Sequence, residues 1–403
     1  MTSLSSQPAL AGADVAVLGG GIVGAAVAQE LSRRGTDVIL VEAAGPGTGS
    51  SGRCDGNVLV QTKHDELTVR LTEHSIGTYR RWAAELAMDI RFEQRGSLVF
   101  FTDPAQAAQA PGRVEWLRGA GVRAEYIGAD EIRRREPGLR GDPAGAIDCH
   151  DDASVYPPAV VAGLVEDARK HGCRVLTGVR ARRLIIGRGG RVRGVETDDG
   201  VITAPFVVNA MGVWSPRLDT SGHVPLPVRP RQGVLVVTEE APGLVRRTVT
   251  EAVYMTNRAS AGQGADATIA FVAEPTWRGN VLLGSSRRFC GHDVSVDDEI
   301  LTAIVTRAAR FLPELRKLRV IRSFAGLRPW TPDNKPIIGA ASGLPGYVLA
   351  TGHEGEGVGL APVTAELVAA AVLEAPVSGP LSEALTAFSP DRLLDRDQYE
   401  EVS

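Results

Sequence analysis

The chain has 403 residues, more than one ordinary hydrophobic core accommodates, so we expect two domains or one large α/β domain with an insert. Its 44 basic and 48 acidic residues nearly balance, which excludes a global field that would attract nucleic acid or acidic lipid. The four cysteines lack C-x-x-C spacing, so we predict no metal site and a reducing, cytoplasmic compartment. Residues 1–12 predict no signal peptide, and the apolar runs predict no membrane span.

The first predicted element is an apolar strand at 14–18 that runs directly into Gly19-Gly20-Gly21-Ile22-Val23-Gly24. A helix of small residues follows, and a second apolar strand at 38–41 ends at Glu42. This is the G-x-G-x-x-G fingerprint in its strand, turn, helix and strand context. A glycine-rich turn alone is common, but these parts together predict dinucleotide binding.

Each part of the fingerprint has a physical task in holding a dinucleotide. Gly19 permits the tight turn out of the strand, Gly21 lets the backbone approach a pyrophosphate, and Gly24 lets the helix lie close to the sheet. Free N–H groups at the start of the helix, at Ile22 and Val23, then face the phosphates. Glu42 is placed to accept hydrogen bonds from an adenosine ribose.

Beyond this unit the sequence predicts further helices and strands, and then a region rich in strands. Helices are expected at 64–87, around 114–117, and at 156–170, 296–311 and 362–373. Strands are expected at 91–102, 174–176, 181–186, 206–208, 233–238, 248–255, 268–273 and 280–285. Two more, between 186 and 206, are expected to extend to 197 and to 201.

The α/β pattern is interrupted twice, which sets the predicted fold class. We predict an α/β protein with a Rossmann-like cofactor domain of the glutathione-reductase type and an antiparallel-sheet substrate domain. The cofactor domain is expected at 13–88, 150–225 and 323–390, the substrate domain at 89–149 and 226–322, and flexible termini at 1–12 and 391–403.

Three glycine-rich segments far from the fingerprint extend the predicted site: 49–57, 209–212 and 352–359. The first offers N–H groups and hydroxyls to a second phosphate, the second allows close approach to a flat ligand, and the third opens a helix near a redox ring. Each alone is also explained as a loop without a ligand. Together they describe an extended cofactor with a phosphate end and a distant redox end, which is FAD.

The residues expected to bind FAD follow from these segments. They are Gly19, Gly21, Ile22, Val23, Gly24, Glu42, Gly49, Ser50, Ser51, Gly56, Asn57, Val179, Ala210, Gly212, Gly352, Gly355, Gly357, Val358 and Gly359.

The fingerprint with Glu42, the Gly49-Ser50-Ser51 loop, residues 207–215, and Gly326-Leu327-Arg328-Pro329 with 331–333 carry a family resemblance. They resemble the D-amino-acid oxidase superfamily of flavoproteins, and the resemblance covers nearly the whole chain in the expected order. Within it the chain is similar to glycine and sarcosine oxidases, D-hydroxyproline dehydrogenases, and the flavin subunits of opine dehydrogenase and hydrogen cyanide synthase.

The resemblance implies FAD-dependent oxidation of a carbon–nitrogen bond in a D-amino acid, imino acid or N-substituted glycine. A neutral amine would lose the hydrogen on its α-carbon as hydride to flavin N5, and the imine would hydrolyse. The protein would mainly orient the substrate, so no dedicated general base is required.

Arg328 is the expected substrate anchor, because it matches the segment that supplies the carboxylate-binding arginine in similar glycine oxidases. A bidentate guanidinium suits a carboxylate in an apolar pocket, although an arginine paired to a structural acid is the alternative. Tyr254, on a predicted strand, is a candidate to cover the pocket or bind the carboxylate, or it packs in the sheet. His353 and Asn57 are candidates near the flavin, although a lone loop histidine is more often a structural hydrogen-bonding group.

The loop at 49–56 departs from the covalent flavoenzymes of this superfamily. Sarcosine and dimethylglycine dehydrogenases carry a flavin-linked histidine there, whereas this chain has Arg53 beside Cys54. Monomeric sarcosine oxidases use a cysteine in a C-terminal segment that has none here. We therefore expect non-covalent FAD, with Cys54 as the less favoured attachment point.

Two rival functions remain open beside an oxidase that uses O₂ as its acceptor. One is a dehydrogenase subunit that passes electrons to a partner protein or quinone, as a homo- or hetero-oligomer, which the paired glutamates Glu354 and Glu356 favour. The other, more remote, is a flavin-binding protein without turnover.

Overall fold

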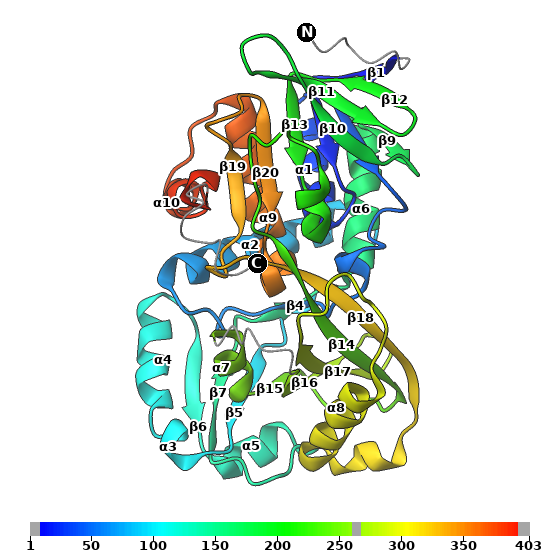
Figure 1. The fold of residues 1–403 in the computed structure, drawn as a ribbon. Coiled ribbons are helices and arrows are strands. Elements are labelled where there is room, and N and C mark those ends of the chain that lie inside the picture. The colour runs from blue at the N-terminus through cyan, green and yellow to red at the C-terminus, as the bar shows by residue number, and fades with distance from the viewer. Residues whose placement is uncertain (1–8, 260–266, 394–403) are drawn as a thin grey trace.

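The computed structural model describes residues 9–259 and 267–393, and these form two halves stacked on one another (Figure 1). The upper half in this view contains a six-stranded sheet in the order β19-β20-β13-β2-β3-β9. All neighbouring pairs are parallel except β19 with β20. The strands are β2 (Val15–Leu18), β3 (Val38–Glu42), β9 (Arg174–Thr177), β13 (Phe206–Asn209), β19 (Ile337–Ala340) and β20 (Tyr347–Thr351).

Both faces of this sheet are covered, which explains why β2, β3 and β20 are apolar almost throughout. Helices cover one face: α1 (Ile22–Arg33), α6 (Pro157–Lys170) and α9 (Gly357–Leu373). A four-stranded sheet covers the other, in the order β1-β12-β11-β10, with β1 (Ala9–Gly12), β10 (Ala181–Ile186), β11 (Val192–Thr197) and β12 (Gly200–Thr203). This confirms the predicted Rossmann-like fold.

The helix at the C-terminal end of the chain is long and apolar enough to cross a membrane by length and composition, over Glu354–Leu373. In the fold it packs against α1 and α2 (Glu66–Glu85), and 78% of its most apolar window is buried. The helix belongs to the protein core.

The lower half is built around an eight-stranded sheet in the order β18-β14-β17-β16-β15-β5-β7-β6. It is mixed rather than purely antiparallel, since β15 and β5 run parallel. Helix α8 (Asp298–Phe311) covers one face. The strands are β5 (Ser97–Phe101), β6 (Ala124–Ile127), β7 (Gly145–Cys149), β14 (Arg229–Glu240), β15 (Thr248–Glu251), β16 (Thr268–Pro275), β17 (Asn280–Arg287) and β18 (Val320–Trp330).

Short elements complete the described chain. They are α3 (Pro104–Ala107), α4 (Ala110–Gly119), α5 (Ala129–Arg135), α7 (Val253–Ala259), α10 (Pro380–Ala387), the paired β4 (Asn57–Val58) and β8 (Ala153–Ser154), and the 3₁₀ turns η1 (Ser50–Gly52), η2 (Gly212–Arg217), η3 (Pro313–Lys317), η4 (Glu354–Glu356) and η5 (Pro390–Leu393).

Several expected boundaries differ from the structure. The predicted strand at 248–255 ends at Glu251, and helix α7 begins at Val253, so Tyr254 lies on a helix. Between 91 and 102 the structure has one strand, β5, with a single bridge at Glu93 before it. The helix predicted at 362–373 begins at Gly357 instead. Pro362 lies inside it, and the Val358 carbonyl, which Pro362 cannot bond because it has no N–H, accepts from the Tyr79 hydroxyl at 2.6 Å.

The chain was expected to return to the cofactor domain at residue 323, but it does so only after β18. Strand β18 hydrogen-bonds along β14 as far as Trp330, so it belongs to the eight-stranded sheet. At the other end of the chain, residues 9–12, expected in a flexible terminus, form β1 and pair with β12. The remaining expected flexible residues, 1–8 and 394–403, lie outside the described residues.

Candidate active site

The predicted cofactor segments meet at one edge of the six-stranded sheet. Strands β2, β3, β9, β13 and β20 are parallel, so their carboxyl ends share that edge. The fingerprint follows β2, Glu42 ends β3, Val179 follows β9, residues 210–212 follow β13, and 352–359 follow β20. Ligands of open α/β sheets bind outside this edge.

The fingerprint glycines are required by close backbone contacts. Gly19 has φ +99°, and a Cβ there would lie 2.6 Å from the carbonyl oxygen of Ala210. A Cβ on Gly24 would overlap the carbonyl oxygen of Gly19. Because the glycines have no side chains, α1 and the turn after β13 can both pack against the glycine turn that follows β2. Backbone atoms and not side chains therefore face the carboxyl edge of the six-stranded sheet.

The loop around η1 lies at the N-terminus of α1. The Ile22 N–H donates to the Ser51 hydroxyl at 2.9 Å, and the Gly47 N–H donates to the Gly20 carbonyl at 2.8 Å. The N-cap of α1 is Gly21, which has no side chain to cap the helix. An anionic group at this position would therefore meet backbone N–H groups and a helix dipole.

Glu42 is fixed by the loops on either side of it. One carboxylate oxygen accepts from the Gly20 N–H at 2.7 Å, and the other accepts from the Ala44 N–H at 2.8 Å. The Val179 N–H donates to the Glu42 carbonyl at 3.1 Å, so Val179 supports the acid through its backbone. The carboxylate is thus oriented beside the glycine turn, where the fingerprint places a ribose.

A buried polar network shapes the turn after β13, and the sequence did not reveal it. Asn209 donates from its amide nitrogen to the Tyr347 hydroxyl at 2.8 Å and to the Ser215 carbonyl at 3.1 Å. The Ser215 hydroxyl in turn contacts Thr351, whose own hydroxyl donates to the Gly212 carbonyl at 3.0 Å. This network ties β13, η2 and β20 together behind the predicted site.

Gly56 and Asn57, expected near the flavin, are engaged within the protein. The Gly56 N–H and the Asn57 amide donate to the Glu274 carboxylate at 3.2 and 2.9 Å, and the Asn57 amide oxygen accepts from Thr248 at 2.6 Å. Burial and the nearby Asp55 carboxylate raise the pKa of Glu274 well above its usual range. The Asn57 side chain therefore anchors its loop to the substrate sheet, and a role for it at the flavin edge gains no support.

The loop at 352–359 contains a strained residue at the point where η4 begins. Glu354 has φ +49°, a left-handed conformation that is rare for a side chain of this kind, and its carboxylate also accepts from the Gly355 N–H. Its neighbour in the turn, Glu356, forms a buried ion pair with Lys63. Helix α9 starts directly after them at Gly357.

Glu354 faces three arginines of the eight-stranded sheet. Arg231 on β14 donates to its Oε1 from Nε, at 3.2 Å, and from Nη2. The Nε atoms of Arg287 on β17 and Arg328 on β18 each lie 3.9 Å from the same oxygen. Arg231, Arg287 and Glu354 are buried, whereas the Arg328 side chain is 18% exposed.

Arg328, the expected substrate anchor, lies against the loop at 352–359. Its Nη1 donates to the Ser286 carbonyl at 3.0 Å, and its aliphatic stem lies beside Gly355. The alternative, a pair with a structural acid, also has support, because Arg328 Nε lies 3.9 Å from the Glu354 carboxylate, although the hydrogen bonds to that acid come from Arg231. Neither Arg231 nor Arg287 was predicted.

The family follows from comparison with known proteins. The model of the DAO family, described as FAD dependent oxidoreductase, matches residues 14–371. The chain belongs to this family. Among its relatives is the hydrogen cyanide synthase subunit HcnC of Pseudomonas aeruginosa, 27% identical over 88% of this chain and 91% of the relative.

Two solved structures share the whole fold of this DAO-family protein. Glycine oxidase from Geobacillus kaustophilus gives a TM-score of 0.83 at 25% identity, covering 94% of this chain and 98% of that one. L-proline dehydrogenase from P. horikoshii gives a TM-score of 0.85 at 24% identity, covering 94% and 97%. The chain is an FAD-dependent oxidoreductase, and its bare helix N-terminus, glycine turn and oriented Glu42 fit the dinucleotide of FAD.

Cys54, the less favoured point of flavin attachment, has the character of an inert thiol. Burial raises its pKa far above that of an exposed cysteine, with the Asp55 and Glu274 carboxylates adding to the effect. Its Sγ donates to the Ser51 carbonyl at 3.5 Å. A thiol must be a thiolate to act as a nucleophile, so this environment favours the expected non-covalent FAD.

Tyr254 contacts one of the arginines. Its ring lies 4.4 Å from the Arg287 Cζ, in a cation–π arrangement. Tyr254 comes from α7 and not from a strand, so sheet packing does not account for it. Its ring lies over the Arg287 guanidinium, and a role for it at the substrate pocket stays a prediction.

His353 is a structural residue of α9. It is 3% exposed, and its Nε2 lies 2.9 Å from the Thr364 hydroxyl, which itself donates to the Leu360 carbonyl. Burial lowers the pKa of His353 to about 4, so the imidazole is neutral at pH 7. A catalytic role for His353 is therefore not supported by its position.

The buried imidazole makes stability depend on pH. Below pH 6.5 the unfolded chain protonates this histidine, but the folded protein does so only near pH 4. The free energy of unfolding should therefore fall by up to about 3 kcal/mol between pH 6.5 and 4 through this group alone. Urea unfolding of the wild type and of His353→Gln at pH 7, 5.5 and 4.5 should show a shallower decline in the variant. Equal declines would contradict this account.

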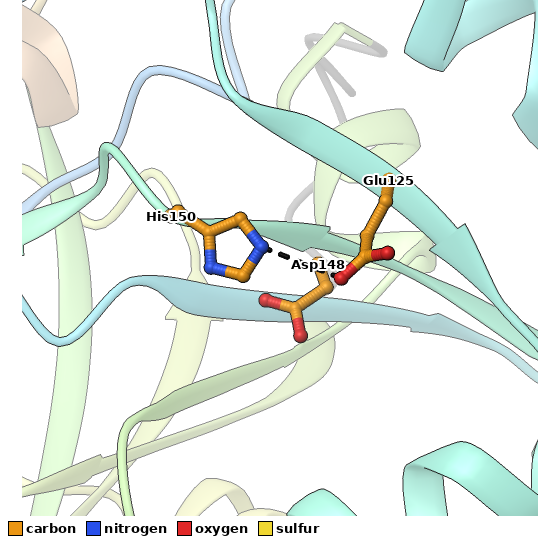
Figure 2. Close-up of side chains that lie close together, drawn as sticks. All are labelled: Glu125, Asp148 and His150. Atoms are coloured by element: carbon orange, nitrogen blue, oxygen red, sulfur yellow. Dashed lines mark hydrogen bonds and ion pairs between the residues drawn. The ribbon is translucent and has the colours of Figure 1, made fainter.

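A separate cluster at the end of the eight-stranded sheet has the spacing of a metal site. Glu125, Asp148 and His150 offer ligand atoms within 4.8 Å of one another (Figure 2). The Asp148 carboxylate, however, already accepts from Arg135, and from Arg247 at 2.7 and 2.9 Å. These guanidinium charges neutralise the acids, so the cluster is a salt-bridge network that joins β6, β7 and the start of β15.

Proposed function

We propose that this flavoenzyme oxidises a carbon–nitrogen bond in an amine that carries a carboxylate: an amino acid, imino acid or N-substituted glycine. The supporting observation is Arg328, a partly exposed guanidinium on β18 that lies against the loop opening α9. A guanidinium in this position offers two parallel N–H donors to a carboxylate. The glycine oxidase similarity supports the same class of substrate.

Each side chain has a task in this proposal. Bound FAD supplies the acceptor for two electrons. Arg328 holds the substrate carboxylate and so fixes which bond faces the cofactor, and positioning of this kind accounts for much of the rate in reactions of this class. Tyr254 covers Arg287 from α7 and would help to exclude water. Glu354, bonded to Arg231, offsets part of the positive charge around the substrate.

The electron acceptor is proposed to be O₂, which would make the protein an oxidase. The alternative is a dehydrogenase that transfers electrons to a partner protein or quinone, and the similarity to a protein named as a synthase subunit favours it. The four free cysteines support the proposed cytoplasmic location. Stoichiometric peroxide per amine consumed would establish the oxidase, whereas dye reduction without peroxide would establish the alternative.

Anaerobic mixing of the yellow holoprotein with an amine panel tests the proposal. The panel should contain glycine, D- and L-proline, D-alanine, sarcosine and iminodiacetate, and each should be paired with its decarboxylated or amidated counterpart. We expect at least one carboxylated amine to bleach the flavin absorbance, and its counterpart without the carboxylate to do so at least about 10²-fold more slowly. A flavin that no amine reduces, although dithionite reduces it, would reject the proposed function.

A further inference from the structure

Two arginines lie directly opposite one another in the sheet below the loop at 352–359. Arg231 pairs with Arg328 in the antiparallel register of β14 and β18, so their side chains lie on the same face. Like charges in this position repel. The Glu354 carboxylate lies near both arginines and accepts a hydrogen bond from Arg231, so it compensates one of the two positive charges.

Arg287 adds a third charge at the same place. It is 4% exposed, and among the described residues its Nε and Nη2 have no hydrogen-bond partner. Its nearest described carboxylate oxygen is the one that Arg231 already occupies, at 3.9 Å from Nε. A buried donor without a partner destabilises the folded protein, and more so when it is charged, so this arrangement is unfavourable as it stands.

The positive charge of the arginines exceeds the negative charge of the acid beside them. Three guanidinium groups surround one described carboxylate, and burial lowers the pKa of Arg287 with the charges of Arg328 and Arg231 adding to the effect. A single substrate carboxylate on Arg328 would still leave Arg287 with unused donors. Because the two Nε atoms lie equally far from one oxygen, they are at most twice that distance apart. One small molecule can therefore reach both.

We infer that the substrate is an amine with two carboxylates, one held by Arg328 and the other by Arg287. This rests on the proposed function and narrows it to secondary amines of the iminodiacetate or opine type, in which a C–N–C bridge joins the two acids. Arg287 then sets specificity for the second carboxylate, and Tyr254 holds the plane of its guanidinium. The bond to be oxidised lies between the two anchors.

Two matched pairs of small molecules test this inference. Iminodiacetate and sarcosine are substrates that differ by one carboxylate. Diglycolate and methoxyacetate are their ether counterparts, which have no carbon–nitrogen bond and report binding alone through the flavin spectrum. The variants are Arg287→Met and, as control, Arg288→Met, the neighbouring residue whose guanidinium is paired with Asp297 at 2.8 Å.

We expect the holoenzyme to bind diglycolate at least about 10-fold more tightly than methoxyacetate, and Arg287→Met to lose that preference by about 10- to 100-fold. The same ratio should appear in kcat/KM for iminodiacetate over sarcosine. FAD content and methoxyacetate binding should be unchanged in Arg287→Met, and Arg288→Met should behave as wild type.

The outcomes separate this inference from the proposed function. Equal affinity for diglycolate and methoxyacetate in the wild type would overturn the inference, even if sarcosine bleaches the flavin. Loss of FAD from Arg287→Met would also overturn it, because the unpaired donors would then belong to the cofactor. Arg287-dependent diglycolate binding without reduction by any amine would support the second anchor and reject amine oxidation.

Discussion

Arg328→Leu is expected to lower kcat/KM for carboxylated amines by about 10²-fold or more, while the protein stays yellow. The charged hydrogen bonds from a guanidinium to a carboxylate are each worth about 1.5–3 kcal/mol, and leucine removes them without adding bulk. FAD binding should survive, because the Arg328 side chain takes part in none of the hydrogen bonds described at the fingerprint and at Glu42. Anaerobic stopped-flow reduction of the flavin is the measurement.

Arg322→Leu provides the control for this experiment. It lies on the same strand but is exposed, beside Phe324, and far along β18 from the loop at 352–359. Its substitution should leave both the reduction rate and its substrate dependence unchanged. If Arg328→Leu reduced as fast as wild type at low substrate concentration, Arg328 would not be the anchor.

Gly24→Ala is expected to yield a protein without FAD, or one too unstable to purify in quantity. The added Cβ would overlap the Gly19 carbonyl, where the turn and helix α1 cannot separate without moving the sheet edge. Overpacking of this kind costs about 1–3 kcal/mol or more, and the displaced turn would no longer fit a pyrophosphate. Flavin absorbance per protein and the thermal unfolding midpoint report the two effects.

Gly77→Ala on α2 is the matched substitution in an open position. Gly77 is exposed within a helix, and a Cβ there meets nothing within 4 Å. This change should raise the free energy of unfolding by up to about 1 kcal/mol, because alanine has a higher helix propensity than glycine. Full FAD content and unaltered stability in Gly24→Ala would show that the turn adapts, contrary to the close packing described above.

The cofactor half of the site could be predicted because its signals are local. Gly19, Gly24 and Glu42 lie within one βαβ unit, and backbone geometry alone dictates the glycines. The order of strands in the parallel sheet then brings the later glycine segments to the same edge, so the convergence also follows from the sequence. The Asn209 network was missed, since its partners come from distant strands and nothing in their spacing marks them.

The substrate half was only partly predictable, since it depends on long-range pairing. Arg231 and Arg328 face one another because β14 pairs with β18. The two residues are almost a hundred positions apart in the sequence, and no local pattern predicts that register. Tyr254 was placed on a strand because apolar and β-branched residues continue past Glu251, yet the chain turns into α7 there. His353 was a candidate because of its position in the sequence, and only the fold reveals that it is buried against Thr364.

Strand β18 has a consequence for how the two ligands influence one another. Its Gly326 packs against the Arg53 backbone, its Leu327 carbonyl accepts the Ser50 hydroxyl, and the next residue is Arg328. The loop expected to cradle phosphate and the arginine proposed to bind substrate are therefore continuous over three residues. Occupancy at one end should alter affinity at the other, and by thermodynamic reciprocity a substrate analogue should raise the affinity for FAD by the same factor by which FAD raises the affinity for the analogue.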